Sequence, residues 1–71
     1  MIIYSFKNTP HFKKIKKIIE ENDEKNESIK SNPTAIMLRT GYDYKEIIAI
    51  LNSLIRINNL KKHNFYYTFK S

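Results

Sequence analysis

A glycine-marked turn between two predicted helices constrains the fold of this chain more than any other feature. Asn32 followed by Pro33 is typical of a helix start, because the Asn side chain caps a backbone N–H and proline there loses no hydrogen bond. Gly41, the only glycine, marks the end of that helix, where a left-handed backbone is common. Asp43 and Glu46 then have the spacing of a capping box. The pattern predicts two helices joined by a tight turn.

The second of these helices has a clear apolar stripe. Its apolar side chains recur at intervals of three and four residues, which places them on one face. They are Ile47, Ile50, Leu51, Leu54 and Ile57. The predicted ranges, 33–40 and 44–58, have the spacing of a helix-turn-helix, in which the second helix can lie in a DNA major groove. A plain helical hairpin in a small bundle is the alternative.

The chain before this pair predicts one more helix. Thr9-Pro10 is a second helix start, and the helix is expected over 10–22. The apolar face is formed by Phe12, Ile15, Ile18 and Ile19, and the remaining surface by Lys13, Lys14, Lys16 and Lys17. The run 22–28 has no apolar residue and predicts a surface loop. Ile29, between polar neighbours, is interpreted as the single inward residue of a very short strand.

Both ends of the chain favour extended structure. Residues 1–6 are apolar and β-prone, so they predict a strand that caps the core or pairs with a second copy of the chain. After Leu60 the pattern alternates and predicts a hairpin with a two-residue turn at His63-Asn64. In that hairpin Phe65, Tyr67 and Phe69 are expected to share one face.

Length and composition limit the classes of protein. Seventy-one residues suffice for a single domain, 1–71, with one small core, so oligomerisation is a serious alternative to a monomer. The absence of cysteine excludes disulfides, and two distant histidines argue against a zinc site. A net charge of +6 and a pI near 9.7 favour polyanionic partners, although Lys-rich codon usage also explains them. Lacking a signal peptide or a membrane span, the chain is expected to be soluble and cytoplasmic.

The order of predicted elements resembles the winged helix-turn-helix superfamily. The residues that carry the resemblance are Ile36, Gly41, Lys45-Glu46-Ile47, Ile50-Leu51, Leu54, Leu60 and Tyr67. The resemblance implies an α+β, mostly α fold with three helices, a C-terminal β-hairpin wing and a possible extra N-terminal strand. Superfamily members bind DNA or serve as dimerisation and docking modules, so the fold alone leaves the function open.

The segment from Thr40 to Leu54 is also similar to Z-nucleic-acid-binding (Z-alpha) domains, which carry Lys-Glu-Ile at the start of the recognition helix. This chain has Ile48 and Asn52 where that family places its backbone-contacting Asn and Tyr. The wing lacks the Pro-Pro and Trp that complete the family's site. Binding of left-handed DNA is therefore not carried over to this chain.

Candidate nucleic-acid contacts lie on the second helix of the pair and on the wing. The helix offers Tyr44 and Lys45 for phosphate, Ile48 for a thymine methyl group, Asn52 for an adenine edge and Arg56 for the backbone. The wing offers Lys61, Lys62 and His63 for flanking phosphates or the minor groove. These residues predict binding of double-stranded DNA.

Two isoleucines on the same helix complicate that prediction. Ile48 and Ile55 are seven residues apart, and together they would expose an apolar stripe. The stripe could be buried by the N-terminal residues Ile2, Ile3 and Tyr4 of the same or a second subunit, or by another protein.

We therefore expect a small basic DNA-binding homodimer that regulates transcription or replication, for example in a virus, a plasmid or an AT-rich microbe. The alternative is a protein-interaction module that docks on an acidic partner, including one that inhibits a nucleic-acid-binding enzyme.

Catalysis is not expected. The chain has no nucleophile beside a base, no glycine-rich phosphate loop and no clustered carboxylates outside the predicted 20–27 loop. His11 and His63 are interpreted as surface or cap residues rather than catalytic bases. No cofactor and no metal are expected.

Overall fold

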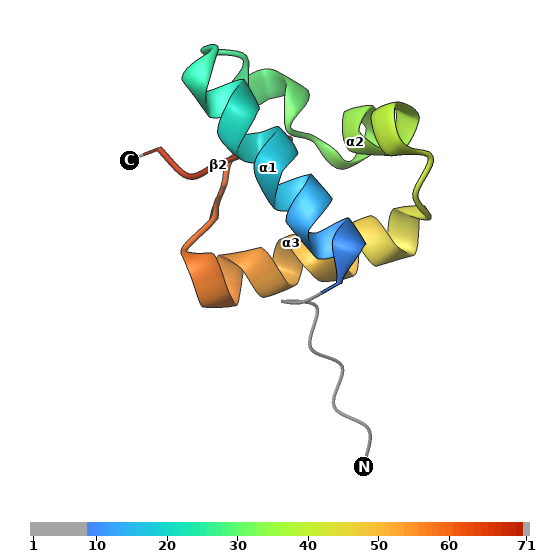
Figure 1. Cartoon of the computed structure of the whole chain (residues 1–71). Helices are drawn as coiled ribbons and strands as arrows, with labels where there is room; N and C mark the ends of the chain where they lie inside the picture. The colour runs from blue at the N-terminus through green and yellow to red at the C-terminus, as the bar shows by residue number, and fades with distance from the viewer. Residues whose placement is uncertain (1–8, 71) are drawn as a thin grey trace.

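The computed structural model describes residues 9–70, which form a helical domain with a small C-terminal hairpin (Figure 1). In chain order the elements are α1 (Pro10–Glu24), the 3₁₀ helix η2 (Ser28–Lys30), α2 (Pro33–Thr40), α3 (Tyr44–Asn58), β1 (Lys61–Lys62) and β2 (Tyr67–Thr68). The predicted class, α+β and mostly α with three helices and a hairpin wing, is confirmed. The strand predicted at 1–6 lies outside the described residues. None of the helices within 9–70 has both the length and the apolar character needed to cross a membrane.

The helix pair α2–α3 begins and ends at the predicted residues because its signals are local. The Asn32 side chain accepts a hydrogen bond from the Ala35 N–H at 2.9 Å, and Asp43 accepts one from the Lys45 N–H at 3.1 Å. Gly41 ends α2 in the left-handed region, at φ 75°. The turn between the helices is therefore fixed by its own residues.

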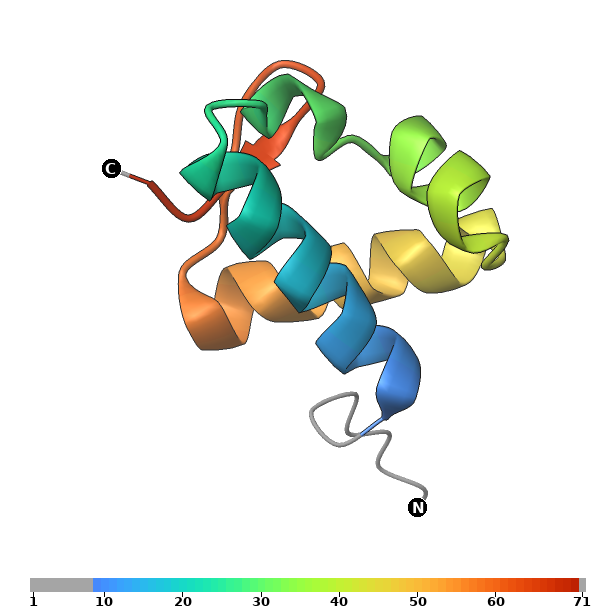
Figure 2. The same ribbon diagram turned by 45° about the horizontal axis from the view of Figure 1, so that its top comes forward.

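One core joins the three helices and the hairpin. Figures 1 and 2 show α1 crossing α3, with α2 packed near the start of α3. The core cluster consists of Phe12, Ile15, Ile19, Ile36, Ile47, Ile50, Leu51, Leu54, Leu60 and Tyr67. Ile18 is also buried, so the predicted apolar face of α1 is confirmed.

The prediction that Ile57 also faces the core is wrong, since it is 46 % exposed. At about 100° per residue, Ile57 lies about 20° beyond Ile50, which places it at the edge of the stripe rather than within it. Leu60 takes the buried place instead. Asn59 adopts a left-handed conformation at φ 57°, and the Leu60 N–H bonds the Leu54 carbonyl at 3.2 Å.

The interpretation of 22–28 as a surface loop is wrong in its first part. Helix α1 continues to Glu24, and Asn22 and Asp23 are buried. The predicted strand at Ile29 is also wrong, because that residue lies in η2 and is 57 % exposed. A polar run can be buried where its side chains find hydrogen-bond partners, and this is the case here.

The hairpin is shorter than predicted. Its antiparallel register pairs Lys61 with Thr68 and Lys62 with Tyr67. The predicted two-residue turn is wrong: residues 63–66 connect the strands, and the His63 N–H bonds the Tyr66 carbonyl at 2.8 Å. Phe65 lies in this connection and is exposed, so it does not share a face with Tyr67.

Candidate nucleic-acid interface

The candidate residues of α3 form a ridge along its outer side. Tyr44, Ile48, Asn52 and Arg56 follow one another at four-residue intervals, which aligns them on one side of a helix. Tyr44, Asn52 and Arg56 are exposed, as is the neighbouring Lys45. The ridge therefore presents an amide, a phenol and two cations to solvent.

The predicted apolar stripe on α3 is smaller than expected. Ile48 and Ile55 are both partly buried and pack against the core cluster. The chain's own core thus covers part of each side chain, which reduces the apolar area left for a second subunit or another protein. The proposed covering residues Ile2, Ile3 and Tyr4 lie outside the described residues.

The cations of α3 and the wing have no acidic partners within residues 9–70. The ion pairs of this part of the chain are His11–Glu46, Lys16–Glu20, Lys30–Glu27 and Arg39–Glu21. Lys45, Arg56, Lys61 and Lys62 take part in none of them. A cation without a protein partner can form a charge-assisted bond to phosphate without first breaking an ion pair.

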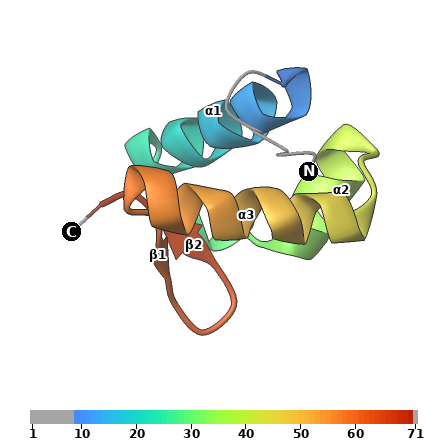
Figure 3. The ribbon, with the colours of Figure 1, turned by 90° about the horizontal axis from the view of Figure 1, so that it is seen from below.

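The wing stands beside α3. Figure 3 shows the β1–β2 hairpin projecting from the side of α3 that faces away from α1. Lys61 and Lys62 are adjacent strand residues, so their side chains leave opposite faces of the hairpin. His63 is exposed and stacks on Tyr66, with 4.7 Å between ring centroids. Of the three predicted wing residues, only Lys62 faces the space between the wing and the helix pair.

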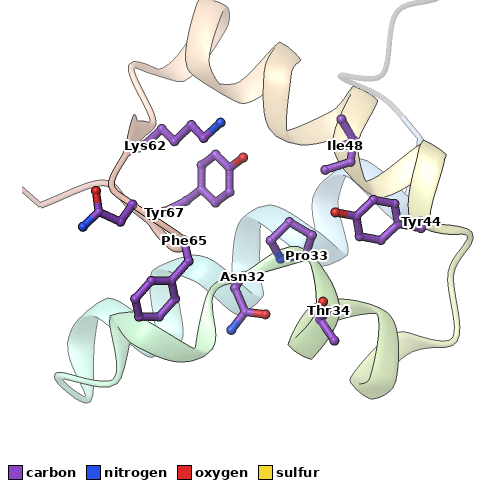
Figure 4. A pocket seen from close by; sticks show the side chains of 9 residues that line it. Asn32, Pro33, Thr34, Tyr44, Ile48, Lys62, Phe65 and Tyr67 are labelled. Atoms are coloured by element: carbon purple, nitrogen blue, oxygen red, sulfur yellow. The ribbon is translucent and has the colours of Figure 1, made fainter.

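That space is a pocket of about 410 Å³, here called the wing pocket (Figure 4). It is lined by Asn32, Pro33, Thr34, Tyr44, Ile48, Lys62, Asn64, Phe65 and Tyr67. Figure 4 shows the hydroxyl groups of Tyr44 and Tyr67 pointing into it from opposite sides. Burial raises the pKa of the Tyr67 phenol, and the nearby phenol of Tyr44 raises this pKa further.

The pocket brings together residues that the sequence predicts as contacts and residues that it does not. The predicted ones are Tyr44, Ile48 and Lys62, and the additional polar ones are Asn32, Thr34, Asn64 and Tyr67. Sequence spacing could not find the second group, because it comes from the start of α2 and from the hairpin. Asn52 and Arg56 lie further along α3 and do not line the pocket.

A buried carboxylate, Asp23, fixes the wing to α1, and no sequence pattern points to it. Its Oδ1 accepts hydrogen bonds from the hydroxyls of Ser28 and Thr68, both at 2.6 Å. Its Oδ2 accepts one from the Phe69 N–H at 2.8 Å. Burial raises the pKa of this carboxyl, but these bonds and the charge of Lys70 outweigh burial and bring the pKa below its ordinary value. We call Asp23, Ser28, Thr68 and the Phe69 N–H the Asp23 cluster.

Two further bonds attach the hairpin beside this cluster. The Tyr67 N–H donates to the Ser31 carbonyl at 2.9 Å, and the buried Asn22 amide donates to the Ser31 hydroxyl at 2.9 Å. The hairpin is thus held against α1 and η2 by polar contacts, and these hold one wall of the wing pocket in place.

The first turn of α3 is tied to α1 by Glu46. Its carboxylate bonds His11 Nδ1 at 2.8 Å, whereas the predicted capping box directs Glu46 back to Asp43. The His11 ring also stacks on Tyr42, with 3.7 Å between ring centroids. His11 therefore positions the start of α3.

Comparison with known proteins added no relatives: the chain matched no protein-family model, no curated protein and no solved structure.

Proposed function

We propose that this protein binds double-stranded DNA through the outer ridge of α3 and the wing. The observation that carries the proposal is the set of exposed cations without acidic partners on α3 and the wing, Lys45, Arg56, Lys61 and Lys62. When such cations contact phosphate, counterions bound to the DNA are released into solution. This release is the main source of affinity for duplex DNA.

The distribution of acidic residues supports the same surface. Most carboxylates lie on α1 or just after it, at Glu20, Glu21, Asp23, Glu24 and Glu27. On the α3 side, Asp43 caps the helix and Glu46 is paired with His11. Few carboxylates therefore lie near the ridge and the wing to repel phosphate, and at the far end of α1 Glu20, Glu21 and Glu27 are paired with cations.

The ridge also offers groups suited to base contacts. Asn52 is exposed midway along α3, and an Asn amide can form two bonds with the major-groove edge of adenine. Ile48 is partly exposed about one turn after the helix start and can contact a thymine methyl group. Tyr44 and Lys45 at the start of α3 would hold phosphate.

We also propose membership of the winged helix-turn-helix superfamily and a role as a homodimeric regulator of transcription or replication in the cytoplasm. A two-fold dimer would bind a palindromic site with half-sites about one helical turn apart. It would also strengthen the weak contact of a single small module.

The test is binding of the purified protein to random-sequence duplex DNA across a salt series. The K45A/K62A double variant should give a shallower salt dependence, by about 0.9 in the log–log slope for each phosphate that the variant no longer contacts. The matched control is K13A/K17A, which removes the same charge from the exposed face of α1. An equal effect of both double variants would contradict the proposed surface. Failure of the unmodified protein to bind duplex DNA at low salt would contradict the function.

A second variant tests the base contacts separately from affinity. N52A removes no charge and leaves the core intact, since Asn52 is exposed. We expect it to reduce discrimination between a selected site and random DNA, by about 1–3 kcal/mol, with an unchanged salt slope. Competition binding with the two DNAs measures this difference.

A further inference from the structure

The wing pocket has more structure than contact with a DNA backbone requires. Phosphate contacts are made by cations, backbone N–H groups and polar side chains, and they do not require a concave site with aromatic walls. This pocket instead combines aromatic rings, amides and hydroxyls around about 410 Å³, a volume within the range of small-molecule sites.

Tyr67 is the most informative residue of the pocket. It is only 5 % exposed, and its ring belongs to the core cluster. Its hydroxyl nevertheless points into the pocket (Figure 4) and forms no hydrogen bond with the rest of residues 9–70. No buried side-chain polar atom in residues 9–70 lacks a partner, so this hydroxyl reaches solvent in the pocket and is available to a ligand.

The charge of the pocket favours an anionic ligand. Among the described residues that line it, Lys62 is basic and none is acidic. Both α2 and α3 begin at the pocket, with Pro33 and Tyr44 as their first residues. The positive ends of the two helix dipoles add to the field of Lys62.

The aromatic groups favour a ligand with a flat face. Phe65 is 56 % exposed at the pocket, although it is a large apolar side chain. The Tyr44 ring lies on the α3 side, across the pocket from the wing (Figure 4). Exposed aromatic rings of this kind are typical stacking surfaces for unpaired bases.

We propose that the wing pocket binds one unpaired nucleotide of a DNA strand, that is, a nucleoside 5′-phosphate unit. Its base stacks on Phe65, its polar edge meets the Tyr67 hydroxyl and the Asn64 amide, and its phosphate contacts Lys62. The inference rests on the proposed DNA binding and adds a preference for duplexes that carry an unpaired nucleotide, such as a bulge or an overhang.

The test compares a blunt duplex with the same duplex carrying a one-nucleotide overhang, measured by fluorescence anisotropy at one salt concentration. We expect the overhang to tighten binding about tenfold, the size of one base stacked on an aromatic ring. F65A should abolish most of that gain, measured as the ratio of the affinities of the same variant for the two duplexes. The matched control is L38A, which removes an even more exposed apolar side chain from α2, outside the pocket.

A conservative variant tests the hydroxyl without disturbing the core. Y67F keeps the ring that packs in the core cluster and removes only the group aimed into the pocket. We expect it to reduce the gain from the overhang several-fold, whereas Y42F, a tyrosine outside the pocket, should leave it intact. Equal binding of both duplexes by the unmodified protein would overturn the inference.

NMR titrations with deoxythymidine 5′-monophosphate and with inorganic phosphate identify what the pocket recognises. Shifts of the Lys62, Asn64 and Phe65 amides with the nucleotide but not with phosphate would support recognition of the base. Equal shifts with both, or saturation by the free nucleotide with no gain from the overhang, would overturn the inference.

The outcomes also separate this inference from the proposed function. Salt-dependent binding of the blunt duplex with no gain from the overhang would contradict nucleotide binding by the pocket and support duplex binding by α3 and the wing. Binding of the overhang strand alone, with no affinity for the duplex, would support nucleotide binding by the pocket and contradict the proposed binding of duplex DNA.

Discussion

The helix pair and the wing are attached to the same molecule by different forces. The pair α2–α3 is attached through apolar side chains, with Ile36, Ile47 and Ile50 fully covered. The wing shares the core through Tyr67 and is attached in addition by hydrogen bonds, those of the Asp23 cluster and the Ser31–Tyr67 backbone bond. The stability gained from apolar burial is nearly independent of pH and of the orientation of the groups. The stability gained from a carboxylate with three hydrogen-bond donors depends on both. The two halves of the proposed DNA surface should therefore respond differently to substitution and to acid.

The largest effect is expected from a cavity in the shared core. I50A should destabilise the protein by about 4 kcal/mol, because it removes a fully buried side chain and leaves an unfilled space. Both halves should lose protection together in amide hydrogen exchange. I57A makes the same change on the same helix at an exposed position, and it should cost about 0.5 kcal/mol or less. Retained protection of α3 in I50A would contradict a common core.

A smaller and more selective effect is expected from D23A. The substitution leaves two hydroxyls and the Phe69 N–H without their acceptor, which should cost about 2 kcal/mol. Exchange at the Tyr67 amide should accelerate more than exchange in α3. D43A removes an exposed capping carboxylate instead and should cost about 1 kcal/mol, with its effect at the start of α3. Uniform loss of protection in D23A would remove the distinction between the two regions.

Acid should loosen the wing when the Asp23 carboxylate becomes protonated. The pKa of Asp23 is lower in the folded protein than its ordinary value of 3.8. The Asp23 carboxylate therefore contributes stability above that value, and the contribution is lost as the pH falls through the lower, folded-state pKa. NMR spectra over this acid range should show the Thr68 and Phe69 amides shifting together as Asp23 is protonated. In D23A this step should be absent, and its persistence would assign the step to another group.

The smallest effect concerns the turn within the helix pair. Gly41 has a φ of 75°, and a Cβ added there would meet no atom within 4 Å. G41A should therefore cost only the strain of a left-handed residue, about 1 kcal/mol, with no steric clash. Urea unfolding should show this shift in midpoint with an unchanged m-value. A much larger loss of unfolding free energy would contradict this account, in which only the left-handed backbone at Gly41 opposes a side chain.

The same contrast explains what the sequence can predict. The bounds of α2 and α3 follow from Asn32, Pro33, Gly41 and Asp43, each of which acts on backbone groups a few residues away. The burial of Asp23 depends on Thr68 and Phe69, and no local pattern reports such distant partners. By local pattern alone, the polar run at the end of α1 therefore resembles a solvated loop.

The candidate site divides in the same way. Tyr44, Lys45, Asn52 and Arg56 are predictable as exposed residues of α3 because helical periodicity fixes their side. The wing pocket is not predictable, because it forms only where the start of α2, the start of α3 and the hairpin meet. The sequence also overstates the exposure of Ile48 and Ile55, since it does not show how closely the core surrounds them.

The distance along the chain between Asp23 and its partners also bears on the order of folding. Thr68 is 45 residues from Asp23, so their contact closes most of the chain into a loop, whereas the caps of α2 and α3 join near neighbours. Closing a long loop costs entropy that local contacts avoid. We therefore expect the helix pair to form before the hairpin docks, and nucleic-acid affinity that depends on the wing to be the last property acquired during refolding.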